Sequence, residues 1–273
     1  MIFKAQIYKL LVLVLFSFGF LSCSVSKNKK VDSKYTLVFE DQFNGNSYNT
    51  KHWSSYPENT GTSPWNRFVV DDKQLTEVKN GNLHVKVRWN SATDLPETGA
   101  IFTKGKFSFK YGKIEVKAKF NKAGQGGWPA IWLMPQTEIY KGWPDGGEID
   151  IMERLNNDEF VHQVVHQTNG KKTAVSSGKT PAINFDGYNL YGIVKLPNRI
   201  EFYVNNVLTM VHEPKEEFQE RWPFETDYYI ILNHASADKG KTGTYFWPGN
   251  VTNTDDFPLE MAVDYVKVWE IKE

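Results

Sequence analysis

Three carboxylic acids lie close together in the stretch DGGEIDIMERL, which runs from Asp145 to Leu155. Glu148, Asp150 and Glu153 have apolar neighbours, so the stretch resembles a β-strand in composition. Crowding carboxylates is unfavourable, because each negative charge disfavours the ionised form of the next. The same crowding can keep one carboxyl group protonated beside an ionised one, and acid catalysis next to a nucleophile requires such a pair.

The spacing of the three acids predicts a β-bulge. Side chains alternate between the two faces of a strand, so Glu148 and Asp150 share a face and Glu153 would fall on the other. One extra residue near Ile151 and Met152 would return Glu153 to the side of the other two acids. With this bulge we expect the two glutamates to lie about 5–5.5 Å apart, which is the separation in retaining glycosidases.

At that separation one glutamate can attack the anomeric carbon of a sugar, while the other protonates the leaving oxygen and then deprotonates water. Asp150 lies between them, where its charge and hydrogen bonds can stabilise one partner and raise the pKa of the other. Two other interpretations are an exposed acidic strand face without chemistry and a calcium site, although the spacing is not that of an EF-hand.

Strand patterns dominate the rest of the chain. Apolar and polar residues alternate with period two in four segments, which are 82–89, 106–120, 199–207 and 261–271. The pairs Asn80-Gly81 and Asn205-Asn206 favour the positive φ of tight hairpins. Many short strands joined by turns predict an all-β antiparallel sandwich in a single domain.

The stretch 121–136 is rich in Gly and Trp. We expect it to begin as a loop, because its first half has too many glycines for a regular strand. A buried strand should then run from Ala130 to Met134.

The composition excludes some partners. The chain has 273 residues, with 32 Lys and Arg against 32 Asp and Glu, so its formal net charge is zero. This balance gives no electrostatic basis for binding nucleic acid or an anionic membrane. Aromatic residues make up 15% of the chain, and their rings can either fill a β core or present flat faces to sugar rings.

The N-terminus has the pattern of an export signal. Lys4 and Lys9 precede the apolar run Leu10–Leu21, which is too short for a comfortable transmembrane helix and is typical of a secretory signal. Cys23, the single cysteine, follows at once and resembles the lipidated residue of a bacterial lipoprotein. An ordinary signal peptide with an incidental cysteine is the alternative, because Phe20 is not the usual aliphatic residue at its position.

We therefore predict three segments: a lipoprotein signal peptide at 1–22, a polar, Lys-rich tether at 23–34 and a catalytic domain at 35–273. The expected location is outside the cell, with the protein anchored by its lipid to the outer membrane or cell surface. Membrane contact would come only through this anchor. With one cysteine, no intramolecular disulfide can form.

The run GGEIDIME resembles the active-site signature of glycoside hydrolase family 16, E-x-D-x-x-E. Further segments match the family in order and spacing, namely FEDQFNG, NGNLHVKV, TKGKFSFKYGKIEVKAKF, GGWPAIWLMP and VDYVKVWE. The resemblance covers roughly Tyr35 to Lys272. It implies a β-jelly roll of two curved antiparallel sheets with a substrate cleft on the concave face. It also implies an endo-acting, retaining hydrolase of β-linked polysaccharides or glycans.

The resemblance assigns roles to individual residues. Glu148 matches the nucleophile of the family, Glu153 the acid/base and Asp150 the carboxylate that assists them. Trp128 and Trp132 match aromatic residues near the cleft, although alternation leaves open which of them faces the sugar, and either could belong to the core.

Four more positions match the surroundings of the cleft. His166 corresponds to a histidine on the strand after the catalytic one, with a structural histidine as the alternative. Asn66 corresponds to an asparagine on the non-reducing side, or is a plain loop residue. Trp143 and Trp247 are candidates for the rim of the cleft.

No cofactor is expected for catalysis. Many members of the family hold a structural calcium ion away from the catalytic face, and the matching oxygen ligands here are Glu40, the carbonyl of Gly45 and Asp264. The alternative is that these two carboxylates are solvated charges at strand ends. We expect a monomer.

The substrate is left open by departures from the β-1,3-glucanase pattern. Ala100 stands at about the place where many of those enzymes have an arginine, and the segment 231–250 is longer than usual. β-Galactosides, including mucin-type O-glycans and algal galactans, are therefore alternatives to a β-1,3-glucan. A lectin-like glycan-binding protein is the non-enzymatic alternative, but such proteins usually lose the catalytic carboxylates.

Overall fold

The computed structural model describes residues 34–57, 63–171, 173–214, 221–240 and 247–272. The chain divides into two compact units, Met1–Asp32 and Ser33–Glu273. The first unit lies outside the described residues, and so do the predicted signal peptide, Cys23 and nearly all of the tether. Within the described residues, no helix is long and apolar enough to cross a membrane.

The second unit is built from two antiparallel sheets. The strands of the larger sheet are β1 (Tyr35–Asp41), β3 (Thr76–Lys79), β4 (Asn82–Asn90), β5 (Leu95–Thr98), β7 (Gly112–Lys122), β12 (Asn189–Leu196), β13 (Arg199–Val204), β14 (Val207–His212) and β16 (Leu259–Ile271). Their order is β14-β13-β12-β7-β16-β4-β3, with β1 paired to β16 and β5 to β4.

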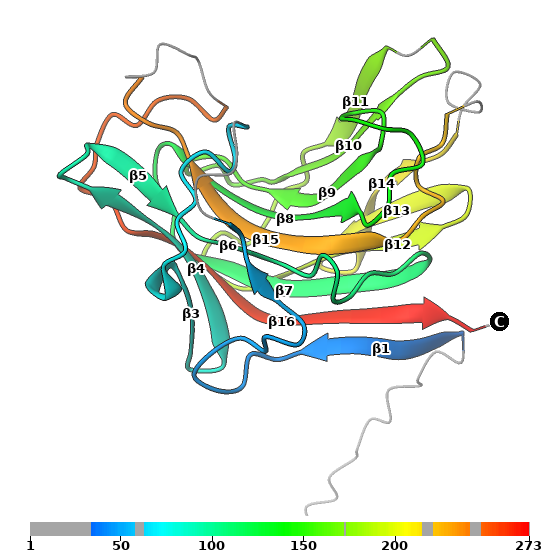
Figure 1. Cartoon of the computed structure of the whole chain (residues 1–273), viewed down its shortest axis with the longest axis horizontal. Coiled ribbons are helices and arrows are strands. Elements are labelled where there is room, and N and C mark those ends of the chain that lie inside the picture. Colours follow the sequence, from blue (N-terminus) through cyan, green and yellow to red (C-terminus); the bar gives the residue numbers. More distant parts are fainter. Residues whose placement is uncertain (1–33, 58–62, 172, 215–220, 241–246, 273) are drawn as a thin grey trace, which may run out of the picture. The chain divides into compact units, whose positions relative to one another are not determined.

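The strands of the smaller sheet are β2 (Ser54–Ser55), β6 (Ala100–Phe102), β8 (Gly127–Pro135), β9 (Glu148–Glu153), β10 (His162–Thr168), β11 (Ala174–Lys179) and β15 (Tyr228–Ser236). Their order is β11-β10-β9-β8-β15-β6-β2. In Figure 1 this sheet is the upper layer, and its outer surface is concave. We call the outer surface of this sheet, turned away from the core, the open face.

Alternation along the strands builds the core between the two sheets. In β7, Ile114, Val116 and Ala118 are fully buried, and Glu115 and Lys117 between them are more exposed. The hairpin turns also follow the sequence pattern, because Asn205 and Asn206 both have positive φ, at 52° and 66°. The predicted two-sheet, all-β architecture is thus present.

Two of the predicted strand boundaries were wrong. The strand β8 begins at Gly127 rather than at Ala130, because Gly127 already pairs with Ser236 of β15. The segment 106–111 is not a regular strand: Phe109 makes only an isolated bridge to Tyr228. A turn that begins with the Phe107 N–H donating to the Thr103 carbonyl redirects this part of the chain.

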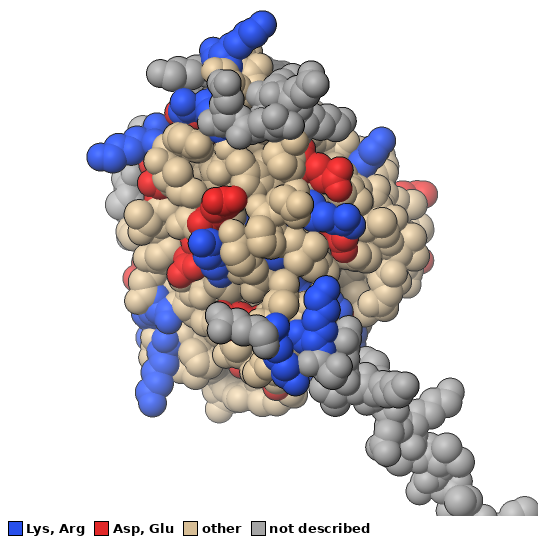
Figure 2. Space-filling view, turned by 90° about the vertical axis from the view of Figure 1, so that its right-hand side faces the viewer, with Lys and Arg blue, Asp and Glu red and all other residues tan. Residues whose placement is uncertain are grey.

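The charged side chains on the surface are mixed. On the side of the molecule that Figure 2 shows, basic and acidic side chains lie interspersed among uncharged ones. This agrees with the zero net charge of the sequence.

Candidate active site

The strand β9 carries the three carboxylates and contains the bulge that their spacing predicted. Met152 pairs with Ile131 of β8 and Asp150 pairs with Trp132, so Ile151 is the extra residue. The pairing of β9 with β10 shifts at the same place. Ile151 and Met152 are both fully buried in the core, and Glu153 therefore returns to the open face.

Each glutamate accepts a hydrogen bond from a tryptophan. The Trp143 Nε1–H donates to Glu148 Oε2 at 2.9 Å, and the Trp128 Nε1–H donates to Glu153 Oε1 at 2.8 Å. Asp150, between them, is only 2% exposed. The two glutamates are thus oriented by separate donors on the same face of the sheet, as nucleophile and acid must be.

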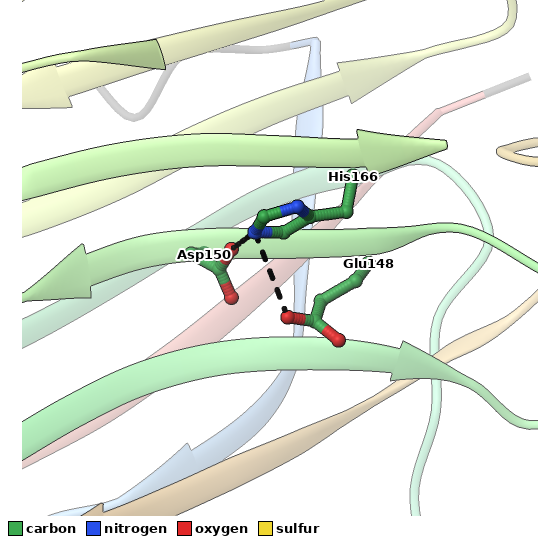
Figure 3. A group of neighbouring side chains, drawn as sticks. All are labelled: Glu148, Asp150 and His166. Atoms are coloured by element: carbon green, nitrogen blue, oxygen red, sulfur yellow. Dashed lines mark ion pairs between the residues drawn. The ribbon is translucent and has the colours of Figure 1, made fainter. Parts of the chain in front are cut away.

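A histidine of the neighbouring strand β10 completes the group. His166 Nε2 lies 3.2 Å from Asp150 Oδ2 and 3.9 Å from Glu148 Oε1, and Figure 3 shows the ring reaching over β9 towards both carboxylates. His166 Nδ1 is 2.6 Å from Ser176 Oγ on β11. The ring is therefore held from one side while its other nitrogen faces the acids.

Burial raises the pKa of all three carboxyl groups above their usual values. For Glu148 the nearby charge of Asp150 raises the pKa further, and for Asp150 the charge of Glu153 does so. The N–H of Trp128 lowers the pKa of Glu153 and so opposes the effect of burial. The folded protein thus keeps protons in this group at pH values where ordinary carboxyl groups are ionised, as an acid catalyst requires.

The turn before Glu148 depends on a glycine. Gly147 has φ +84°, and a Cβ there would lie 2.5 Å from the hydroxyl of Tyr228. That hydroxyl donates to the Gly146 carbonyl at 3.3 Å. Beneath it the buried ammonium of Lys195 lies 4.9 Å from the centre of the Tyr228 ring, and burial lowers the pKa of Lys195 to about 7. This packing fixes where β9 starts and hence where Glu148 lies.

Aromatic residues continue the open face on the β15 side of the carboxylates. Trp132 donates its Nε1–H to Asn233 Oδ1 at 2.7 Å, and its ring meets that of Trp65 edge-on at 4.8 Å. Asn66 is buried next to Trp65 and donates to the Tyr56 hydroxyl at 3.2 Å. Trp128 and Trp132 therefore both belong to the open face, which alternation had left undecided.

The other side of the carboxylates has two exposed tryptophans. Trp247 is 46% exposed, and its ring centre is 5.4 Å from that of His162, a β10 residue that pairs with Glu153. Trp143 is 64% exposed and lies 5.7 Å from the ring of His166. The structure thus places Trp143 at the carboxylates and Trp247 beside His162, and their role at the rim of a substrate cleft stays a prediction.

Comparison with known proteins gives the family. The model for glycosyl hydrolases family 16 matches residues 65–247. The chain is a member of this family. The keratan-sulfate endo-1,4-beta-galactosidase of Sphingobacterium multivorum is 37% identical over 247 residues, which are 87% of this chain and 56% of that protein. The glucan endo-1,3-beta-glucosidase A1 of Niallia circulans is 28% identical over 267 residues, 86% of this chain and 38% of that protein.

Solved structures support the same fold. One solved structure is 27% identical to this chain in sequence, with a TM-score of 0.76. Its description reads "Prominent members of the human gut microbiota express endo-acting O-glycanases to initiate mucin breakdown". The match covers 87% of this chain and 100% of that one. The predicted jelly roll is therefore confirmed. This family 16 chain spans only about half, or less, of the length of the two curated relatives.

Sequence reasoning missed three residues of the open face: His162, Trp65 and Asn233. Alternation could have found His162, because it lies four residues before His166 on the same strand and so shares its face. Trp65 lies in a loop, where no periodic pattern indicates which way a side chain points. Asn233 lies in a strand that is buried along its whole length, so its amide could not be assigned to either face.

The predicted calcium site was Glu40, Gly45 and Asp264. Glu40 Oε1 lies 2.9 Å from Lys267 Nζ, and Asp264 Oδ2 lies 2.6 Å from Lys117 Nζ. Each carboxylate thus already has a lysine as its counter-ion. A calcium ion bound by these carboxylates would have to replace both lysines. The site stays a prediction.

Replacing Glu148 with Gln should stabilise this family 16 protein near neutral pH. The folded state keeps a proton on Glu148 above the unfolded pKa, so unfolding becomes easier as the pH rises from the unfolded pKa to the raised folded one. The glutamine cannot ionise, so the variant does not lose stability in this way as the pH rises. Urea unfolding at pH 4 and pH 7 measures it.

The matched control for this stability measurement is Glu159→Gln, which makes the same change in charge at an exposed position. We expect the gain for Glu148→Gln to shrink towards pH 4. An equal effect of both variants at pH 7 would contradict the assigned burial cost.

Gly147→Ala should lower both stability and turnover. A side chain at positive φ costs about 1 kcal/mol, and the added Cβ would also collide with the hydroxyl of Tyr228. Gly142→Ala is the control, because Gly142 has a similar φ of +90° but nothing within 4 Å of its Cβ position. The melting temperature and kcat of both variants distinguish the backbone strain at positive φ, which both share, from the collision with Tyr228, which only Gly147→Ala has. Equal losses in the two variants would mean that the contact with Tyr228 does not position Glu148.

Proposed function

We propose that this chain is an endo-acting, retaining glycosidase that cleaves internal β-galactosidic linkages in a polysaccharide or glycan. The observation that carries the proposal is the bulged strand β9, which brings Glu148, Asp150 and Glu153 to one face with separate hydrogen-bond donors for the two glutamates. A protein that only binds glycans has no use for three buried carboxylates, because burying them lowers stability.

The chemistry follows from the two glutamates. Glu148 attacks the anomeric carbon as the glycosidic C–O bond breaks, and the proton of Glu153 passes to the leaving oxygen. Glu153 then takes a proton from water, and the resulting hydroxide displaces Glu148 from the same carbon. Two displacements on opposite sides return the β configuration. The raised pKa of Glu153 supplies the proton in the first half.

Asp150 and His166 modulate this pair. A negative Asp150 raises the pKa of Glu148, and a protonated His166 lowers it. Substrate binding excludes water from the group and strengthens both effects. We propose that, once the substrate is bound, the proton of this pair passes to Asp150 and leaves Glu148 ionised for attack, because Asp150 is the more buried of the two.

Binding surfaces on both sides of β9 support an endo mode of action. Trp132 and Trp65 lie towards β15, and Trp247 and His162 lie beside β10. Trp132 itself is 5% exposed and supports the half-buried Trp65 from below. A polymer crossing the strands would therefore contact Trp65 on one side of the scissile bond and Trp247 on the other, which binds chain interiors better than chain ends.

The preference for a β-galactoside rests on the relatives and on one position of the open face. The keratan-sulfate endo-1,4-beta-galactosidase is 37% identical, against 28% for the glucanase. At about the place of the arginine of many β-1,3-glucanases, Ala100 pairs with Asn233 across β6 and β15. The methyl group of Ala100 cannot donate the hydrogen bonds that an arginine would donate to sugar hydroxyls, so a different sugar can be preferred here. Hydrolysis of a β-1,3-glucan is the second candidate function, favoured by the glucanase relative.

A digest of a glycan panel tests the activity. The full chain is incubated with keratan chains, mucin O-glycans, agarose and laminarin, and new reducing ends and product masses are measured. We expect short oligosaccharides with galactose at the new reducing end, first formed as the β anomer by NMR. Cleavage of laminarin alone would favour the second candidate function, hydrolysis of a β-1,3-glucan. Binding without products at any pH would mean that the chain is a glycan-binding protein and not a hydrolase.

In the same digest, Glu148→Gln should lower kcat by about a thousand-fold or more, because the nucleophile is lost. Circular dichroism checks that the variant is folded, and Glu159→Gln should keep full activity. Substantial turnover by folded Glu148→Gln would remove Glu148 from the role of nucleophile.

We also propose that the chain is exported and lipid-anchored through Cys23, after removal of the signal peptide 1–22, with 23–34 as the tether of the domain 35–273. The charged start, the short apolar run and the cysteine that follows support this. A surface location suits an enzyme whose polymeric substrate cannot enter the cell. Labelled palmitate should be incorporated in a bacterial host and lost in Cys23→Ser. Equal labelling of both proteins would contradict the anchor.

A further inference from the structure

We propose that Glu148, Asp150 and His166 together form a binding site for a zinc ion, which would occupy the place of the substrate. The three side chains come from two adjacent strands, β9 and β10, and converge on one point of the open face (Figure 3). One ligand atom from each lies within 4.8 Å of the other two.

Two of the three distances between ligand atoms are close to those of a zinc site. His166 Nε2 lies 3.2 Å from Asp150 Oδ2 and 3.9 Å from Glu148 Oε1. Tetrahedral zinc with bonds near 2.0–2.2 Å places neighbouring ligand atoms about 3.4 Å apart. The third distance, between the two carboxylates, is at most 4.8 Å, so a rotation of the Glu148 side chain towards Asp150 would close the site. Three protein ligands leave the fourth position for water.

One carboxylate oxygen of Asp150 lacks a hydrogen-bond partner. Asp150 is 2% exposed, and its Oδ2 accepts no hydrogen bond, although His166 Nε2 lies 3.2 Å away. Buried carboxylate oxygens normally have a partner, and leaving one without is unfavourable. A cation between Asp150 and His166 would supply that partner.

The second nitrogen of His166 is already placed as in a metal-bound histidine. Its Nδ1 lies 2.6 Å from Ser176 Oγ. When Nδ1–H donates to that oxygen, the lone pair of Nε2 faces the two carboxylates, which is the usual outer-shell arrangement of a histidine ligand. One nitrogen and two oxygens suit zinc better than magnesium or calcium, which prefer oxygen ligands alone.

Zinc in this site would occupy the carboxylate that the proposed mechanism uses as its nucleophile. Reversible inhibition by zinc therefore follows, and this consequence rests on the proposed function. The binding of zinc does not, because it depends only on the three side chains. The two proposals can therefore fail separately.

The test is calorimetric titration of the metal-free, tag-free full chain with ZnCl₂. We expect one zinc ion per chain. His166→Ala should weaken binding by at least about ten-fold. His162→Ala is the matched control, since it removes a histidine from the same strand and face but outside the site, and it should bind zinc as the wild type does.

Cobalt gives a second measurement that needs no variant. Co²⁺ bound by one nitrogen and two carboxylates should show visible absorption bands, which zinc should abolish and magnesium should leave unchanged. Absence of a zinc site in the wild type, or equal affinity in wild type and His166→Ala, would overturn the proposal. If His166→Ala does not fold, the cobalt spectrum of Glu148→Gln decides, and an unchanged spectrum would overturn it.

Measuring hydrolysis in the same samples separates the two proposals. Zinc binding without hydrolysis of any glycan would support the proposed metal site and contradict the proposed enzymatic function. Hydrolysis that is indifferent to zinc, together with no binding, would do the reverse.

Discussion

The extra residue in β9 is the constraint on which the active site depends. Ile151 and Met152 both enter the core, and only for this reason do Glu148, Asp150 and Glu153 share the open face. Apolar burial stabilises the two inward residues, and the strand thereby carries acids that would be unfavourable on their own. The core and the chemistry thus occupy opposite faces of the same six residues.

The crowding of the three acids is unfavourable for stability, but it also gives them the shifted pKa values that catalysis needs. Burial raises the pKa of all three acids, and repulsion by a neighbouring acid raises the pKa of Glu148 and of Asp150 further. The N–H groups of Trp143 and Trp128 stabilise the charged forms of Glu148 and Glu153. Two chemically identical side chains can in this way hold different protonation states at one pH, which double displacement requires. The same convergence of two carboxylates with a histidine is what makes the group a candidate for zinc.

The surroundings of β9 direct the substrate rather than the chemistry. Family membership and the carboxylates of β9 indicate hydrolysis of glycosidic bonds. Which glycosidic linkage is cleaved depends on residues of other strands and loops. Ala100 and Asn233 lie on β6 and β15, and Trp65 and Trp247 come from loops. These parts can change without disturbing β9, because β8 separates it from β15 and β6.

The amino-acid sequence was enough to predict the sandwich, most strand positions, the bulge and the three acids. Alternation with period two, and the point where it is interrupted, can be read from adjacent residues. Tertiary structure alone decided that Trp128 and Trp143 hold the two glutamates, that His166 reaches Asp150, and that Glu40 and Asp264 pair with lysines. It also decided that 106–111 is not a regular strand. Such contacts join segments far apart in the chain, or side chains in loops, and their geometry follows from how the sheets stack rather than from any local pattern.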